Sequence, residues 1–236
     1  MNTGGLLDQL LKAGSGMLQG NNAATGNGGR GQASQQSGGG SSQLGSLLSG
    51  AGGGALAAGA IGMLLGNKKA RKFGGKAITY GGLAALGVVA YKAYSTWQKN
   101  NQAAPQGQPQ TVDRLPAPQA ELHSHAILRA VIGAAKADGH VDDRERQLID
   151  AEIAKLTPDA AMQQWFDREL NKPLDPGEVA SAASTPEMAA EMYLASVLIV
   201  DEENFMERSY LQELASQLKL DPALKAELEK EVRAAQ

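Results

Sequence analysis

Three carboxylates lie close together in the sequence at a predicted helix–turn–helix junction. Asp138, Asp142 and Glu145 belong to the stretch ADGHVDDRE, in which a glycine follows the first of them. This spacing matches the second half of a calcium-binding EF loop, where an acidic ligand precedes a glycine turn and a glutamate closes the loop. When the stretch is aligned with the EF loop, Ala134 and Lys136 occupy the first two ligand positions, and neither side chain can act as an oxygen ligand. A complete EF-hand is therefore excluded, but a partial oxygen site for calcium or magnesium stays open.

A second stretch, IVDEENFMERSYLQEL, repeats the acidic turn, a Glu-Arg pair and the apolar pattern that follows it. Asp201 and Glu207 are its candidate contributions to a metal site shared by the two turns. Glu202 stands where the turn glycine would be, which argues against two equivalent sites.

The same residues also have a purely structural interpretation. Gly139 can end one helix in the left-handed conformation, Asp142 can cap the next helix, and Glu145 then occupies the third position of that helix as a capping-box partner. No nucleophile or base motif accompanies these carboxylates, so we do not expect an enzyme or catalytic residues. The metal site and the structural interpretation both stay open at this point.

Helical signals fill the chain from residue 120 onward, and no convincing strand is present. Four dipeptides place a Thr or Asp cap before a proline at the first helical position, a pattern typical of helix starts. They are Thr157-Pro158, Asp175-Pro176, Thr185-Pro186 and Asp221-Pro222. With the apolar periodicity they predict an all-α bundle of about seven helices, over residues 121–137, 142–156, 158–171, 176–183, 186–200, 204–218 and 222–234.

Residues 44–94 are Gly-rich and apolar, which predicts a membrane-associated segment. Residues 44–66 contain no charged side chain, and residues 77–94 contain only Lys92. About 20 apolar residues span a bilayer, so these stretches predict a membrane hairpin or a single span. Small residues recur at four-residue spacing in both, which indicates close helix packing and self-association.

The remaining segments complete the predicted organisation. Residues 1–18 carry leucines on one stripe and predict a short amphipathic helix that docks on a membrane or a partner. Residues 19–43 are a Gly/Ser/Asn/Gln tether with too little apolar content to fold. Residues 95–119 form a Pro/Gln linker, so we place the domain boundary near residue 119, before an acidic helical domain over 120–236.

The charges divide the chain into two unlike parts. Residues 1–119 carry ten Lys or Arg against two acids, whereas residues 120–236 carry 12 bases against 23 acids. The acidic part does not suit nucleic acid, because phosphate binding needs a basic surface. His123 and His125, two residues apart on a helix, point to different faces and do not predict a zinc site.

At ADGHVDDRE and VDEENFMERSYL the chain resembles the TerB-like helical domain of tellurite-resistance proteins. The Gly-rich apolar segment, the basic run from Asn67 to Lys72 and this C-terminal domain together resemble the YebE-like family of bacterial inner-membrane proteins of unknown function. The resemblance implies an acidic helical module that binds divalent metal and links membrane complexes to stress responses. It carries over to Asp138, Asp142 and Glu145, and less securely to Asp201 and Glu207.

We therefore expect a non-enzymatic protein anchored in the bacterial inner membrane, whose acidic domain senses divalent metal or binds a protein partner. The alternative is a peripheral scaffold whose acidic face binds a basic protein without metal, and an uncharacterised enzyme comes third. The basic run at Lys68 to Lys76 should stay cytoplasmic. The side of the membrane on which the C-terminal domain lies stays open.

Overall fold

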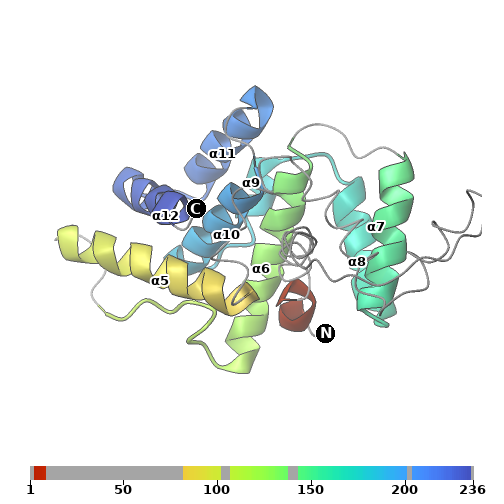
Figure 1. Cartoon of the computed structure of the whole chain (residues 1–236), viewed down its shortest axis with the longest axis horizontal. Helices are drawn as coiled ribbons and strands as arrows, with labels where there is room; N and C mark the ends of the chain where they lie inside the picture. The colour runs from red at the N-terminus through yellow and green to blue at the C-terminus, as the bar shows by residue number, and fades with distance from the viewer. Residues whose placement is uncertain (1–2, 9–81, 102–106, 138–142, 201–203, 235–236) are drawn as a thin grey trace, which may run out of the picture.

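The computed structural model describes residues 3–8, 82–101, 107–137, 143–200 and 204–234, and the elements within these ranges are all helical (Figure 1). A short helix covers residues 3–8. The longer elements are α5 (Gly82–Asn100), α6 (Ala117–Ala135), α7 (Asp143–Leu156), α8 (Ala160–Asn171), α9 (Pro176–Ala180), α10 (Pro186–Ile199), α11 (Phe205–Gln217) and α12 (Pro222–Ala234). The prediction of an all-α domain is confirmed for these residues.

Local capping chemistry explains where most of these helices begin. The side chains of Asp175, Thr185 and Asp221 each accept hydrogen bonds from backbone N–H groups one turn ahead, as their sequence patterns predict. The Thr157-Pro158 prediction is wrong by two residues. Asp159 caps α8 instead, because its carboxylate accepts from two free N–H groups of the first turn, at 2.9 and 3.3 Å.

The core is built around α10, which is apolar on all sides. Most of its side chains are buried, among them Met192, Tyr193 and Leu194, which are wholly inaccessible. A helix that is apolar all round must be enclosed by neighbours. Here α5, α6, α11 and α12 pack against it.

The helices α6 and α10 are neighbours that run in the same direction. His123 on α6 meets Glu191 on α10, at 2.5 Å between Nδ1 and Oε2. One to two turns further along both helices, the Ser196 hydroxyl donates to the carbonyl of Ala130 at 3.4 Å. Since the contacts advance together, the C-terminal ends of α6 and α10 lie at the same end of the bundle (Figure 1).

Helix α5 belongs to this bundle, which differs from the sequence-based prediction of a membrane span over 77–94. It packs against α10 and α12, and its buried face includes Leu86, Ala90, Tyr94 and Trp97. Small residues within α5, among them Gly87, Ala90 and Ala93, are buried inside the protein. The indole N–H of Trp97 donates to the Asp221 carboxylate at 3.0 Å.

The residues that follow α5 also differ from the prediction of a plain linker over 95–119. Val112 is buried, and its backbone N–H donates to the Glu191 carboxylate at 2.6 Å. The folded unit therefore includes α5 and the segment before α6, and it starts well before residue 120. Apolar packing against α10 and α12 holds α5 in this unit, and Val112 supplies Glu191 with a hydrogen-bond donor from outside its own helix.

Among the helices that the structure describes, none has both the length and the apolar composition needed to cross a bilayer. The predicted tether over 19–43, the predicted span over 44–66 and the basic run that follows lie outside the described residues. The predicted N-terminal helix over 1–18 is described only for residues 3–8.

Candidate functional site

The two acidic turns follow the C-terminal ends of α6 and α10, which the parallel packing brings to one end of the bundle. Asp138, Asp142 and Asp201 lie outside the described residues, and Glu145 is described only by its backbone in the first turn of α7. Within the described ranges, no three His, Cys, Asp or Glu side chains are grouped so that they could hold a metal ion. The proposed five-residue metal site therefore stays a prediction, and the structure establishes only the position of the helix ends that precede it.

Glu207 is the one proposed ligand whose side chain is described. It is buried, with 5% of its surface exposed, and its carboxylate accepts a hydrogen bond from the Asn204 side chain at 3.1 Å. Asn204 in turn caps α11 by accepting from the N–H of Met206 at 2.9 Å. A helix cap with an acidic residue three positions on is therefore present at the second turn, the arrangement that the structural interpretation predicts for Asp142 and Glu145 at the first turn.

Electrostatics at this end of the bundle favour a cation. Each helix carries about half a negative charge at its C-terminus, so two parallel helices ending together concentrate negative potential before any side chain is counted. Lys136 caps the C-terminal end of α6, and its positive charge offsets part of this negative potential. Its ammonium donates to the carbonyls of Glu169 and Lys172 at the end of α8, and burial lowers its pKa.

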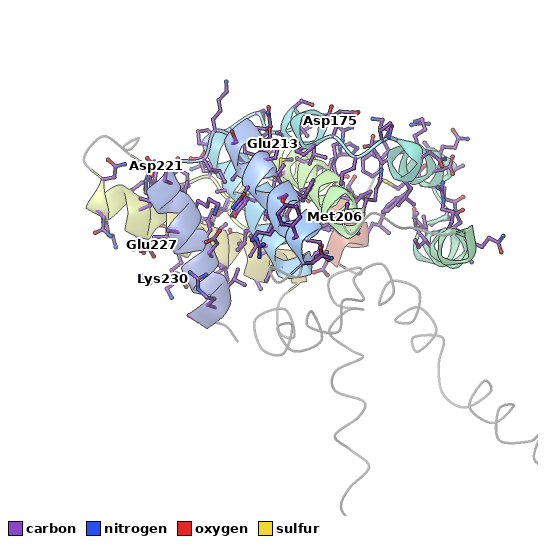
Figure 2. The ribbon with its side chains drawn as sticks, turned by 90° about the horizontal axis from the view of Figure 1, so that it is seen from above. Asp175, Met206, Glu213, Asp221, Glu227 and Lys230 are labelled. Carbon is purple, nitrogen blue, oxygen red and sulfur yellow. The ribbon has the colours of Figure 1, made fainter. Side chains whose placement is uncertain are left out.

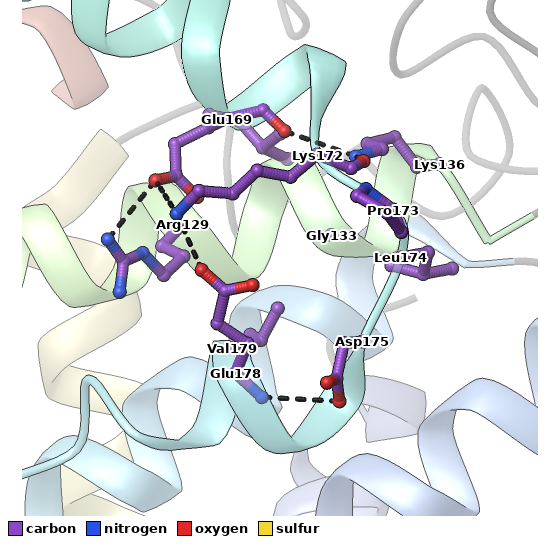
Figure 3. A pocket seen from close by; sticks show the side chains of 11 residues that line it. Arg129, Gly133, Lys136, Glu169, Lys172, Pro173, Leu174, Asp175, Glu178 and Val179 are labelled. Atoms are coloured by element: carbon purple, nitrogen blue, oxygen red, sulfur yellow. Dashed lines mark hydrogen bonds and ion pairs between the residues drawn. The ribbon is translucent and has the colours of Figure 1, made fainter.

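A charged cluster beside this end joins α6, α8 and α9 (Figure 3). Glu169 accepts from Arg129 at 3.2 Å and from Lys172 at 2.8 Å, and Lys172 also pairs with Glu178 at 2.5 Å. The two carboxylates raise the pKa of Lys172 through these hydrogen bonds. The cavity between these residues measures about 20 Å³, enough for one water molecule but not for a substrate. We interpret the cluster as a structural clamp between three helices.

A buried polar pair inside the bundle escaped the sequence analysis. Glu191 is fully inaccessible and is held by His123 and by the N–H of Val112. Burial raises the pKa of Glu191, although these two hydrogen bonds oppose the rise. The sequence signal that could have revealed this pair was Glu191 itself, a single carboxylate in the middle of the otherwise apolar α10. The expectation that the two neighbouring histidines face apart is confirmed, because His125 stacks on Trp165 with ring centroids 4.4 Å apart.

Two large apolar side chains stand at the surface directly after the second acidic turn. Phe205 is 72% exposed and Met206 is 56% exposed, both in the first turn of α11. Figure 2 labels Met206 on this helix. The guanidinium of Arg208 lies 5.9 Å from the Phe205 ring centroid. A carboxylate-bearing turn followed by exposed apolar side chains is a composition suited to contact with another macromolecule.

The comparisons with known proteins give a family but no activity. A family described as "Protein of unknown function (DUF533)" matches residues 50–232. A relative from Yersinia enterocolitica, described as "Uncharacterized protein in ampR 5'region", is 29% identical over 107 residues, which cover 45% of this chain and 77% of the relative. No solved structure matches this chain. Because the family match covers most of the sequence, the chain belongs to the DUF533 family of proteins of unknown function.

Proposed function

We propose that this protein is a non-enzymatic, membrane-associated binding protein of the bacterial inner membrane whose paired acidic turns bind a divalent cation. The observation that carries the proposal is the parallel packing of α6 and α10, whose C-terminal ends lie together where the two acidic turns begin. Negative helix ends and hard carboxylate oxygens both favour calcium or magnesium. The resemblance of these turns to the TerB-like domain agrees with this assignment.

The first turn is the main source of ligands in this proposal. Glu207 is already engaged by Asn204 and nearly inaccessible, so the second turn contributes less than a symmetrical site would. We assign Asp138, Asp142 and Glu145 as principal ligands and Asp201 as a secondary one. Because the set of ligands is incomplete, we expect weak binding, with a Kd of roughly 10⁻⁴–10⁻³ M, as in the weakest calcium modules.

The non-enzymatic part of the proposal is supported by how the nearby charged groups are used. Among the described residues beside the turns, Glu169, Lys172 and Glu178 are committed to ion pairs with one another, and the cavity between them is only about 20 Å³. Such a cluster fixes helices and leaves no room for a reacting molecule.

Membrane association is supported by the sequence of residues 44–66, which lie outside the described part of the chain. This stretch has no charge and is followed by five basic residues within Lys68–Lys76. We expect the full chain to remain in the membrane pellet after extraction at alkaline pH. Recovery of the full chain in the alkaline supernatant would contradict the membrane part of the proposal and leave the cation part untouched.

Cation binding is tested by thermal unfolding of the full chain with and without calcium or magnesium. At a cation concentration tenfold above Kd, mass action adds about 1.4 kcal/mol, or roughly 3 to 6 °C in Tm. The double variant Asp138→Asn/Glu145→Gln should lose this rise. A charge-matched control, Asp150→Asn/Glu213→Gln, changes two exposed acids outside the turns and should keep it.

The alternative function is a scaffold whose acidic end binds a basic protein without metal. The exposed Phe205 and Met206 beside the second turn favour a macromolecular partner. If no cation shifts the Tm of the unmodified chain, and Asp138→Asn/Glu145→Gln lowers its stability, the carboxylates serve as caps and the cation proposal is wrong.

A further inference from the structure

The N-terminal segment Thr3–Asp8 is docked on the helical bundle, far in sequence from the helices that it contacts. Leu7 is fully inaccessible, and Leu6 and Thr3 are 4% and 1% exposed. Figure 1 shows this short helix, in red, beside α6. Burying two leucines is worth about 1.5–3 kcal/mol each, so the contact is more than incidental.

Hydrogen bonds fix the segment at both of its ends. Glu121 on α6 accepts from the N–H groups of Thr3 and Gly4, at 2.5 and 3.2 Å. At the other end the Asp8 carboxylate accepts from the N–H of Leu83, in the first turn of α5, at 3.3 Å. The bonds to Glu121 satisfy N–H groups of the segment, and the bond to Asp8 satisfies an N–H in the first turn of α5 that has no acceptor within the helix.

Close approach between the segment and α6 depends on a glycine. A Cβ atom at Gly4 would lie 3.2 Å from the Ser124 hydroxyl and 3.8 Å from the Leu83 side chain. The docking site is therefore matched to this segment in shape as well as in hydrogen bonding.

We propose that the surface formed by α5 and α6 is a docking site for the chain's own N-terminal segment, and that docking closes residues 9–81 into a loop with both ends at one place. Asp8 and Leu83, which bound this loop, are in direct contact. The entropic cost of closing a loop rises only slowly with its length, so the long insertion is compatible with docking.

The closed loop restricts how the intervening residues can cross a membrane. A chain that leaves and returns to the same point must cross an even number of times. A single span over 44–66 would place Thr3–Asp8 and α5 on opposite sides and break their contacts. While the segment is docked, the loop of residues 9–81 as a whole must therefore enter and leave the membrane on one side, or not enter it. This consequence rests on the proposed membrane association, whereas the docking itself does not.

The docking is tested by cross-linking, because the chain has no cysteine of its own. In the variant Gly4→Cys/Ser124→Cys the two sulfurs would be within disulfide reach. We expect oxidation of the purified full chain to give a reducible link within one monomer. The control pair Gly4→Cys/Gln147→Cys, with the second cysteine at an exposed position on α7, should not form it.

Two further measurements keep the result decisive. Adding Leu7→Asp to the cross-linking pair should slow link formation at least tenfold, because a charge cannot enter the buried leucine site. Circular dichroism of each reduced variant reports whether the bundle is still folded. A folded bundle that gives no link, or only links between two chains, would overturn docking within the monomer.

The same pair tests the loop in membranes. We expect the link to form in the membrane fraction of cells that produce the full-length variant. A link that forms in detergent solution but not in membranes would overturn the one-sided loop while leaving docking in solution. If the protein is absent from the membrane fraction, the membrane association fails and the cross-link in solution still decides the docking.

Discussion

The pairs α6–α7 and α10–α11 share one plan, a helix, an acidic turn and a second helix with a Glu-Arg pair, yet they are packed differently. Helix α11 lies against α9, α10 and α6, and it buries Tyr210, Leu211 and Leu214. The main neighbour of α7 is α8, and its described buried side chains are Ile149 and Ile153. The second pair lies around the centre of the core, whereas α7 and α8 extend the core at its side (Figure 1).

The difference has a physical cause in what each first helix offers its neighbours. Helix α10 is apolar on all sides, and other helices pack around it. Helix α6, in contrast, has a polar face that carries Glu121, His125 and Arg129. The comparison teaches that helices which follow similar turns do not receive similar environments. A turn beside α10 has a buried glutamate, Glu207, that serves as a cap partner.

The largest expected effect comes from the buried carboxylate of α10. Glu191→Ala removes the partner of His123 and of the Val112 N–H, and leaves both buried without that partner. We expect a loss of about 3–5 kcal/mol in the free energy of unfolding, measured by denaturant titration. The comparison variant Glu187→Ala changes a half-buried glutamate in the first turn of the same helix. It should lower the free energy of unfolding by less than about 1 kcal/mol. Equal costs for the two variants would mean that α10 is not the centre of the core.

The next test compares α7 and α11 directly by amide hydrogen exchange. Because α8 is the main neighbour of α7 whereas α11 packs against α9, α10 and α6, the amides of α7 should exchange at least tenfold faster than those of α11 through local opening. Similar protection of the two helices would contradict the view that α7 lies at the side of the core.

Capping variants sharpen the comparison between the two turns. Asn204→Ala removes the cap of α11 and the partner of Glu207, and should cost about 1–2 kcal/mol. Asp142→Ala should cost a similar amount without metal if Asp142 is mainly a cap. If Asp142 is mainly a ligand, that variant should lose little stability and should lose the cation-dependent rise in Tm. Denaturant titration with and without calcium separates the two roles.

The smallest expected effect concerns the contact between α10 and α12. Glu229 accepts from Lys225 at 2.6 Å and from Tyr193 at 2.7 Å. Burial alone would raise the pKa of Glu229, but these hydrogen bonds outweigh it and lower the pKa below 4.5. The stabilisation is therefore present above the unfolded-state pKa and is lost as the pH falls through the lower folded-state pKa. Glu229→Gln should cost about 1 kcal/mol at pH 7 and almost nothing at pH 2. A difference in Tm that does not depend on pH would contradict this account.

Sequence alone was sufficient for features that depend on neighbouring residues. The caps at Asp175, Thr185 and Asp221 and the ranges of most helices follow from hydrogen bonds within one turn, which the local pattern encodes directly. The opposite orientation of His123 and His125 follows from helical geometry in the same way. The acidic turns stay predictions from residue type and spacing, because residues 138–142 and 201–203 lie outside the described part of the chain.

Only the tertiary structure decided which elements share a core. The apolar, small-residue pattern of α5 suits a membrane and a protein interior equally well, and the choice between them here depends on α10 and α12, which are remote in sequence. The pairing of His123 with Glu191, and the contacts of Thr3 and Gly4 with Glu121, likewise join residues far apart in the chain. A single sequence contains no direct record of such long-range contacts, because they form only when folding brings separate apolar faces together and the buried polar groups must then find partners.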